Sequence, residues 1–324
     1  MLNRLAKILA VFVIMAVLTL LIVVAVMPAL VALRDDGVDG SAVVADARFP
    51  VAIEPIDDGG FVYAERETGQ VRLVRSGGDL DPSPVATLPV ATDGQRGLLG
   101  LARVTDGEDA RLFASWTRAE DGRLVVGQVF PGEPVVVWEG PESVDQGNGG
   151  HLEASPEGKL VVGVGDAGAT ELIDDPDAPN GKLLLLDPDG EVGQTPEVLS
   201  SGWRNPFAFD YDEDGRLWVA DNAPPGQPER IGLGDKEDGF VVELTENLAP
   251  SALVALADGD LGLCGFLDGQ MRRVDVNRGV RTGTDPTAAL TEDVEVEPCT
   301  VAATQLADGT ILFATETEIR RKGT

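Results

Sequence analysis

The chain has 324 residues, 43% of them hydrophobic and 5% aromatic, which is enough for one large all-β domain or two smaller ones. Its 39 glycines and 21 prolines favour many short strands joined by turns over long helices. The chain has 55 acidic and 25 basic residues, so its net charge is −30. A negative field of this strength repels polyanions, which excludes nucleic acid as a partner. The acidic residues are spread along the chain, as in a solubilising surface or a cation-binding face.

The N-terminal segment differs in composition from everything that follows. Arg4 and Lys7 precede an uncharged run of about 26 residues from Ile8 to Leu33. A cleavable signal has an apolar stretch of only about 7–15 residues, whereas about 20 are needed to span a bilayer. The run therefore predicts an uncleaved transmembrane helix, which would make the membrane a partner of the chain through residues 8–33.

The anchor divides the chain into three parts. Residues 1–34 form the cytoplasmic stub and the anchor, residues 35–47 are typical of a linker, and residues 48–324 form the folded domain. Because basic residues stay on the cytoplasmic side of a membrane span, we expect the folded domain on the extracytoplasmic side of the cell membrane.

An acidic residue followed by glycine recurs about every fifty residues along the body of the chain. The six copies are Asp58-Gly59, Asp106-Gly107, Glu157-Gly158, Asp214-Gly215, Asp258-Gly259 and Asp308-Gly309. Apolar residues lead up to each pair and a strand-like segment follows it, which is a strong hairpin signal because glycine accepts the positive φ of the turn. Further strands are predicted to start at Gln70, Arg123, Lys182 and Gln270.

The period of the repeat decides between all-β architectures. Six units of about fifty residues, each long enough for three or four strands, predict a six-bladed β-propeller preceded by a single N-terminal transmembrane helix. A β-sandwich does not explain a fixed period, and seven or eight blades require more chain. Closing the ring removes long sheet edges and leaves a central channel whose mouth is the expected ligand site.

Cys264 and Cys299 are the only cysteines. In an oxidising compartment they can form one disulfide, and the alternative is a pair of buried free thiols.

Several segments within the repeat share their residues and order with one enzyme family. They are Asp93-Gly94-Gln95-Arg96-Gly97-Leu98-Leu99-Gly100, Gly149-Gly150-His151-Leu152, Val164-Gly165-Asp166-Ala167-Gly168, Gly181-Lys182-Leu183-Leu184, and Gly202-Trp203-Arg204-Asn205-Pro206-Phe207. On these residues the chain resembles the glucose/sorbosone dehydrogenases, quinoproteins that use pyrroloquinoline quinone (PQQ), including the aldose sugar dehydrogenases. The resemblance covers about residues 50–225.

The resemblance implies oxidation of the C1 hydroxyl of an aldose, with PQQ as hydride acceptor, calcium polarising the quinone and a histidine as general base. It assigns Gln95, Arg204 and Asn205 to the cofactor and Asp166 to orienting the base. Each residue also has a structural interpretation. Gln95 can cap a turn, Arg204 can pair with a carboxylate, and Asp166 can accept backbone N–H groups at the end of a strand.

The expected base is replaced. Gly147 stands at the position of the family's histidine, and glycine cannot accept a proton. His151, the only histidine, lies four residues further on, roughly 13 Å along an extended strand. The same parity allows it to face the same side, so it is either a substitute base or a polar strand residue.

The cofactor and metal positions depart from the family as well. Asp268 stands where the resemblance implies a basic residue, and Leu290 to Leu306 contains neither lysine nor arginine. In the segment corresponding to the calcium loop, the backbone carbonyls of Ala223 and Pro224 are the candidate ligands.

Three functions are compatible with this pattern. The first is a membrane-anchored sugar dehydrogenase that uses PQQ. The second is a catalytically degenerate propeller that binds a glycan or a protein at the cell surface. The third is a hydrolase or lyase of another propeller class, such as a metal-dependent lactonase. The sequence does not choose among them and does not indicate an oligomeric state.

Overall fold

The computed structural model describes residues 41–106, 109–224, 226–236, 240–277 and 287–323. The chain divides into a unit Met1–Val43, of which only the last three residues are described, and a compact unit Val44–Thr324. The second unit carries the fold and the site.

Six four-stranded sheets make up this unit. The first sheet contains β2 (Pro50–Pro55), β3 (Phe61–Glu65), β4 (Gln70–Val74) and β5 (Ala86–Thr87). The second contains β6 (Leu98–Asp106), β7 (Asp109–Thr117), β8 (Arg123–Phe130) and β9 (Val135–Glu142). The third contains β10 (Gly149–Ala154), β11 (Leu160–Val164), β12 (Lys182–Leu186) and β13 (Glu197–Ser201).

The fourth sheet contains β14 (Pro206–Tyr211), β15 (Leu217–Asp221), β16 (Arg230–Leu233) and β17 (Phe240–Glu243). The fifth contains β18 (Pro250–Ala255), β19 (Leu261–Gly265), β20 (Met271–Asn277) and β21 (Thr287–Val296). The sixth contains β22 (Ala303–Gln305), β23 (Ile311–Ala314), β24 (Glu318–Lys322) and β1 (Ala42–Asp46). The strands predicted near residues 70, 123, 182 and 270 are all present, and a 3-10 turn at Thr170–Leu172 is the only helical element within the described ranges.

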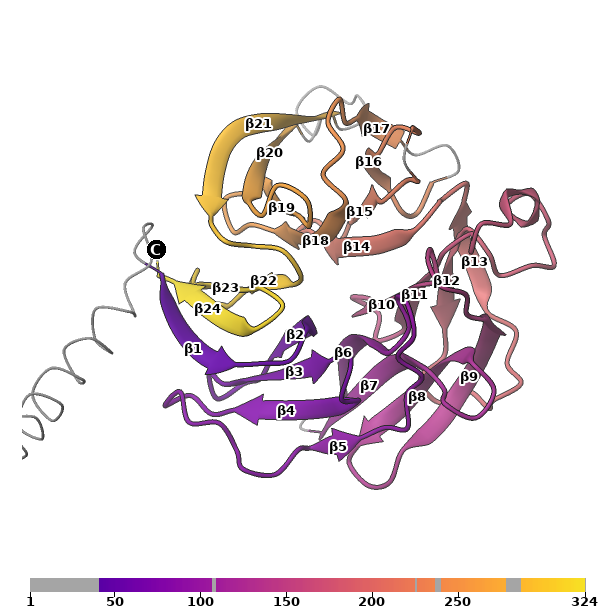
Figure 1. The fold of residues 1–324 in the computed structure, drawn as a ribbon, viewed down its shortest axis with the longest axis horizontal. Coiled ribbons are helices and arrows are strands. Elements are labelled where there is room, and N and C mark those ends of the chain that lie inside the picture. The colour runs from indigo at the N-terminus through magenta and orange to yellow at the C-terminus, as the bar shows by residue number, and fades with distance from the viewer. Residues whose placement is uncertain (1–40, 107–108, 225, 237–239, 278–286, 324) are drawn as a thin grey trace, which may run out of the picture. The chain divides into compact units, whose positions relative to one another are not determined.

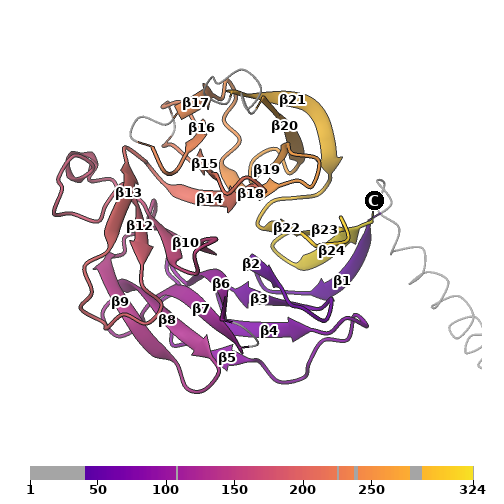
Figure 2. The ribbon, with the colours of Figure 1, turned by 180° about the vertical axis from the view of Figure 1, so that it is seen from behind.

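The sheets are arranged as a closed ring (Figures 1 and 2). The first strand of each sheet lies innermost and contacts the first strands of both neighbours, and the contact of β22 with β2 closes the circle. The predicted six-bladed propeller is confirmed.

The ring is completed by the segment before the first blade. Residues 42–46, which the sequence assigns to the linker, form β1 and pair with β24 as the outer strand of the sixth sheet. The C-terminal part of the chain supplies only three strands of this sheet, and β1 adds the fourth that every other sheet has.

The repeated acidic-glycine pairs lie at one end of the ring, each between an innermost strand and the next. Gly59, Gly158 and Gly215 adopt positive φ of 81°, 76° and 76°. The preceding acid has its own role: Asp58 accepts a hydrogen bond from Gly60 N–H at 2.9 Å, and Asp308 accepts one from Thr310 N–H at 2.9 Å. The second copy falls partly outside the described residues, because Gly107 is not among them.

The opposite end of the ring is irregular in a repeated way. In five sheets the innermost strand has a β-bulge within its first residues: Pro50/Ala52, Leu98/Gly100, Gly149/Leu152, Pro206/Ala208 and Pro250/Ala252. A bulge inserts an extra residue and redirects its side chain. This end of the ring is therefore where side chains depart from strict alternation.

The hydrophobic core lies between neighbouring sheets. Phe113 and Trp138 of the second sheet, for example, pack in one buried cluster with Leu152, Leu160 and Leu184 of the third. Burial of these faces is the main favourable contribution to the fold.

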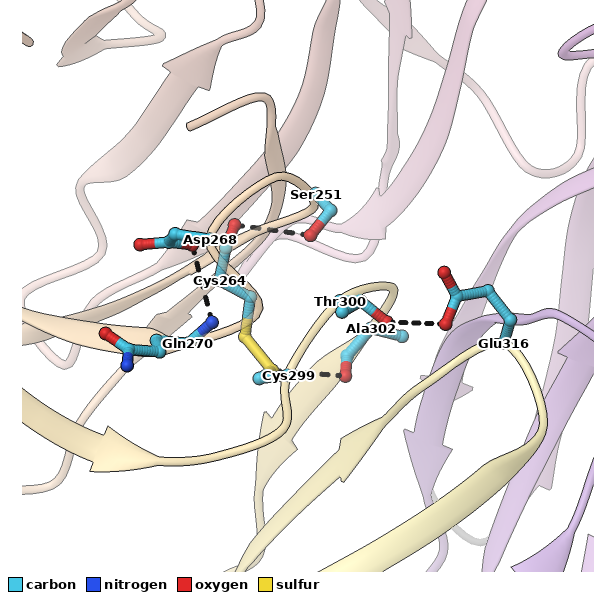
Figure 3. The surroundings of a disulfide bond; sticks show 8 residues. All are labelled: Ser251, Cys264, Asp268, Gln270, Cys299, Thr300, Ala302 and Glu316. Carbon is cyan, nitrogen blue, oxygen red and sulfur yellow. Dashed lines mark hydrogen bonds between the residues drawn. A yellow bond between two sulfur atoms is a disulfide. The ribbon is translucent and has the colours of Figure 1, made fainter. Parts of the chain in front are cut away.

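A disulfide joins Cys264 of β19 to Cys299, which precedes β22 (Figure 3). It cross-links the fifth and sixth sheets near the bulged end of the ring, so the alternative of two free thiols is not realised.

Among the described residues, no helix is both long and apolar enough to cross a membrane. The predicted anchor, residues 8–33, lies outside them.

Candidate functional site

The bulged end of the ring contains a cavity of about 630 Å³. It is lined by Gln95, Val144, Asp145, Gln146, Gly147, Asp166, Ala167, Gly168, Arg204, Asn205, Asn222, Ala223 and Pro224. Seven residues singled out in the sequence thus meet here, although they come from five separate stretches of the chain. The volume is in the range of small-molecule sites.

A smaller cavity of about 170 Å³ adjoins it and shares Gln95, Asn205 and Asn222. Residues of all six sheets, or of the turns leading into them, line this second cavity. The bulged residues Leu99 and Phe207 are among them, so the bulges supply part of its wall.

Two carboxamides hold the loop that carries Gly147. Gln95 Oε1 accepts a hydrogen bond from Gly147 N–H at 2.9 Å, and Asn205 Oδ1 accepts one from Gly149 N–H at 2.9 Å. Their nitrogens have no hydrogen-bond partner in the described part of the chain. Each amide therefore has donors left for a ligand.

Asp166 and Arg204 form an ion pair at the wall of the cavity. Asp166 is only 3% exposed; its Oδ1 accepts from Gly168 N–H at 2.8 Å, and its Oδ2 lies 3.3 Å from Arg204 Nη1. The Arg204 side chain is 25% exposed. Both structural interpretations of these residues are thus realised, and the charge of Arg204 is largely compensated inside the protein.

The turn that presents Arg204 and Asn205 is held by Asp221, a fully buried residue at the end of β15. Its carboxylate accepts the backbone N–H groups of Arg204 at 2.9 Å and Asn205 at 2.8 Å, and Arg230 Nη2 lies 3.0 Å from Oδ2. Burial raises the pKa of Asp221, while these hydrogen bonds and Arg230 act against the rise.

Gly147 lies beside Asp166, where the resemblance implies a base. Its φ is +72°, and a Cβ added to it would meet nothing closer than 3.7 Å, with Asp166 Oδ1 at that distance. The structure therefore has space for a side chain next to Asp166, but this sequence provides none.

His151 does not line either cavity. Its Nε2–H donates to the carbonyl oxygen of Phe209 at 3.1 Å, and its ring meets the Phe209 ring edge-on at 4.5 Å between centroids. Burial lowers its pKa to about 4, so it is neutral at pH 7. The bulge between Gly149 and Leu152 breaks the strand alternation on which the sequence argument relied.

The fifth sheet does not supply the positive charge that the cofactor positions lack. Asp268 Oδ2 lies 3.1 Å from Arg272 Nε, and Arg272 also pairs with Glu246 at 2.5 Å. These charges compensate one another within the fifth sheet and the connection that leads into it. The ionisable residues lining the larger cavity are Asp145, Asp166 and Arg204, which are two carboxylates and one cation.

The residues present do not fit PQQ. A buried tricarboxylate needs several cations to offset its desolvation, whereas the larger cavity offers one guanidinium already paired with Asp166 and the adjoining cavity offers one more, Arg66.

The candidate calcium ligands Ala223 and Pro224 do line the larger cavity. The carbonyl oxygen of Pro224 also accepts a hydrogen bond from Gln227 N–H at 3.0 Å. Across the described ranges, no three His, Cys, Asp or Glu side chains are grouped to hold a metal ion. Calcium takes 6–8 oxygen ligands, so two carbonyls alone do not form a site.

The lining residues that were not predicted include Arg66, Asn148 and Asn222. Arg66 directly follows β3 and Asn222 directly follows β15, each the second strand of its sheet. The signal that would have found them is this shared position in the repeat.

A propeller with its polar cavity at one mouth of the channel defines the class of protein. The sequence model of the family described as glucose/sorbosone dehydrogenase matches residues 47–231, more than half of the chain, and the chain belongs to this family. Among curated proteins, none has a sequence that matches significantly.

Solved structures share the fold. An oxidoreductase described as a glucose dehydrogenase from Thermus thermophilus is 24% identical, with a TM-score of 0.74 over 87% of this chain and 98% of that chain. The aldose sugar dehydrogenase of Streptomyces coelicolor, solved in its PQQ-bound form, is 23% identical, with a TM-score of 0.70 over 86% and 95%. The soluble aldose sugar dehydrogenase of Escherichia coli is 19% identical, with a TM-score of 0.72 over 87% and 98%.

Proposed function

We propose that this chain is a membrane-anchored, extracytoplasmic member of its family that binds a saccharide in the larger cavity without oxidising it. One observation carries the proposal: the cavity keeps its carboxamides and an internally compensated ion pair but has no proton acceptor at Gly147 and no surplus of cations. Carboxamides that donate and accept suit the hydroxyl groups of a neutral sugar, and the sugar dehydrogenases among its structural neighbours support that ligand class.

Two features support the location. The uncharged run Ile8–Leu33 follows Arg4 and Lys7, which favours a span with its N-terminus in the cytoplasm. The Cys264–Cys299 disulfide is of a kind that persists in oxidising compartments outside the cytosol. Protease treatment of intact cells should then remove the propeller; complete protection would contradict the extracytoplasmic placement.

Oxidation of an aldose with PQQ is the second candidate. The observation that favours it is that Gln95, Asp166, Arg204 and Asn205 meet in one cavity with space at Gly147. PQQ would supply the hydride acceptor. Two observations argue against this candidate: the cation of the larger cavity, Arg204, is already paired, and Gly147 provides no base. Loss of a general base alone typically lowers a rate by about 10²–10⁴-fold.

Calorimetric titration of the full chain in detergent with D-glucose tests the first candidate. The wild type should bind, Asn222→Ala should bind about tenfold more weakly because a lining carboxamide is lost, and Gln128→Ala, on β8 outside both cavities, should match the wild type. Equal affinities for all three proteins, or no heat with the wild type, would refute binding in this cavity.

A further inference from the structure

The smaller cavity contains a cation that the proposed function does not use. Arg66 follows β3 at the bulged end of the ring and lines this cavity. Its guanidinium carbon lies 3.8 Å from the centroid of the Phe49 ring. Gly97 leaves space for its stem, since a Cβ there would lie 2.5 Å from Arg66 Cγ. The guanidinium is thus held in place by stacking and close packing.

The charge of Arg66 is poorly compensated by the protein. No aspartate or glutamate is among the residues lining the smaller cavity. Within the described part of the chain, its acidic partner is Glu67, at 3.3 Å from Nη2, and that carboxylate is 58% exposed and therefore well screened. Arg66 Nε is buried and has no hydrogen-bond partner among the described residues. A buried donor without an acceptor is unfavourable until a ligand supplies one.

The two hydroxyls that line the same cavity can only accept further hydrogen bonds. Ser251 Oγ donates to the carbonyl oxygen of Cys264 at 3.2 Å, and Thr300 Oγ1 donates to Glu316 at 3.0 Å (Figure 3). They therefore suit the hydroxyl groups of a ligand. Glu316 does not itself line the cavity, and neither does Glu229, whose carboxylate accepts the backbone N–H of the lining residue Ala249 at 2.9 Å.

The rest of the wall combines carboxamides, among them Asn205 and Asn222, with an apolar part to which Val51, Leu99 and Phe207 contribute. Such a wall fits the C–H face of a sugar ring and excludes water, which strengthens an ion pair with a buried guanidinium. The ligand chemistry that matches a single fixed cation, acceptor hydroxyls and apolar walls is a monocarboxylate that also carries hydroxyl groups.

We propose that Arg66 binds the carboxylate of a sugar acid, such as a uronic acid, whose neutral part extends past Asn205 and Asn222 into the larger cavity. This rests on the proposed function, because it assigns a substrate class to the same saccharide site. A single carboxylate matches the one available guanidinium, and the net charge of −30 is screened beyond a Debye length of about 8 Å at physiological salt.

Calorimetric titrations of the full chain in detergent with D-glucuronate and D-glucose test the assignment. Wild type should bind glucuronate about 10- to 100-fold more tightly than glucose, and Arg66→Gln should lose that preference. Arg66→Lys should keep most of the preference, which separates loss of charge from loss of folding. Arg75→Gln removes an exposed arginine paired with Asp81 and should match the wild type.

The outcomes separate the two proposals. If wild type binds glucose as well as glucuronate, or if Arg66→Gln keeps the preference, the role of Arg66 is refuted and saccharide binding stands. If neither sugar binds, both proposals fail. Tighter binding of glucose 6-phosphate than of glucuronate would overturn the assignment to a carboxylate.

Discussion

Replacing Asp221 with asparagine tests how the propeller holds its cavity. In the wild type this buried carboxylate accepts backbone N–H groups from Arg204 and Asn205 and pairs with Arg230. Asparagine keeps one acceptor oxygen but turns an NH₂ group toward donors. Removing one partner of a buried ion pair typically costs about 3–5 kcal/mol. Dividing this free energy by the unfolding entropy of a unit of roughly 280 residues gives a fall of about 5–9 °C in the melting temperature.

The assay is thermal unfolding of the full chain followed by circular dichroism. Asp81→Asn is the matched control, because Asp81 pairs with the exposed Arg75 at 2.6 Å, and exposed pairs contribute only about 0–1 kcal/mol. Saccharide affinity should fall with Asp221→Asn and not with Asp81→Asn, since only the first loosens the turn at residues 204–205. Melting of Asp221→Asn within about 1 °C of wild type would refute this account of the turn.

Three further predictions follow from the same structure. Gly147→His should fold but lose about 1–2 kcal/mol of stability, because residue 147 has a positive φ. It should show no dye-linked aldose oxidation with added PQQ, since the cations for the cofactor remain absent. Turnover would show that the missing base was the only deficiency. Burial raises the pKa of Glu54 from its ordinary 4.5 to about 8; the charge of Arg103 opposes the rise and that of Asp210 adds to it. Between these two pH values the folded state keeps a proton that the unfolded chain releases, so the free energy of unfolding falls as the pH rises. The free energy of unfolding of the wild type should therefore fall between pH 6.5 and 8, and Glu54→Gln should make this fall smaller by about 1–2 kcal/mol. Glu67→Gln, at an exposed position, should leave the fall unchanged. Equal pH profiles for wild type and Glu54→Gln would contradict the pKa shift. Replacing both Cys264 and Cys299 with alanine should lower the free energy of unfolding, measured in urea, by about 4 kcal/mol. The reason is that the unfolded chain gains the entropy that closing a loop of 35 residues had removed. An unchanged urea midpoint would contradict a disulfide that constrains the unfolded chain.

The blade architecture was predictable because its signals are local. Each acidic-glycine pair encodes its own hairpin, through the positive φ of a glycine such as Gly59 and the side chain of an acid such as Asp58. By contrast, β1 was assigned to a linker because its pairing partner, β24, lies at the other end of the chain. A five-residue segment gives no local indication of such a distant partner.

The candidate site was partly predictable for a similar reason. Motif residues such as Gln95, Asp166 and Arg204 meet in one cavity, as a shared family motif would place them. The position of His151 was not predictable from parity, because the bulge that redirects it appears only in the strand register. Arg66 belongs to no recognised motif, and only the folded chain shows that it lines the channel.

We infer that this cavity accepts a saccharide but lacks the cations to hold a tricarboxylate quinone. Parallel equilibrium titrations of the full chain with D-glucuronate and with PQQ in the presence of calcium test it most directly. We predict saturable binding of the sugar acid and no change in the quinone absorbance at micromolar protein. Stoichiometric uptake of PQQ, accompanied by oxidation of an added aldose, would contradict the claim.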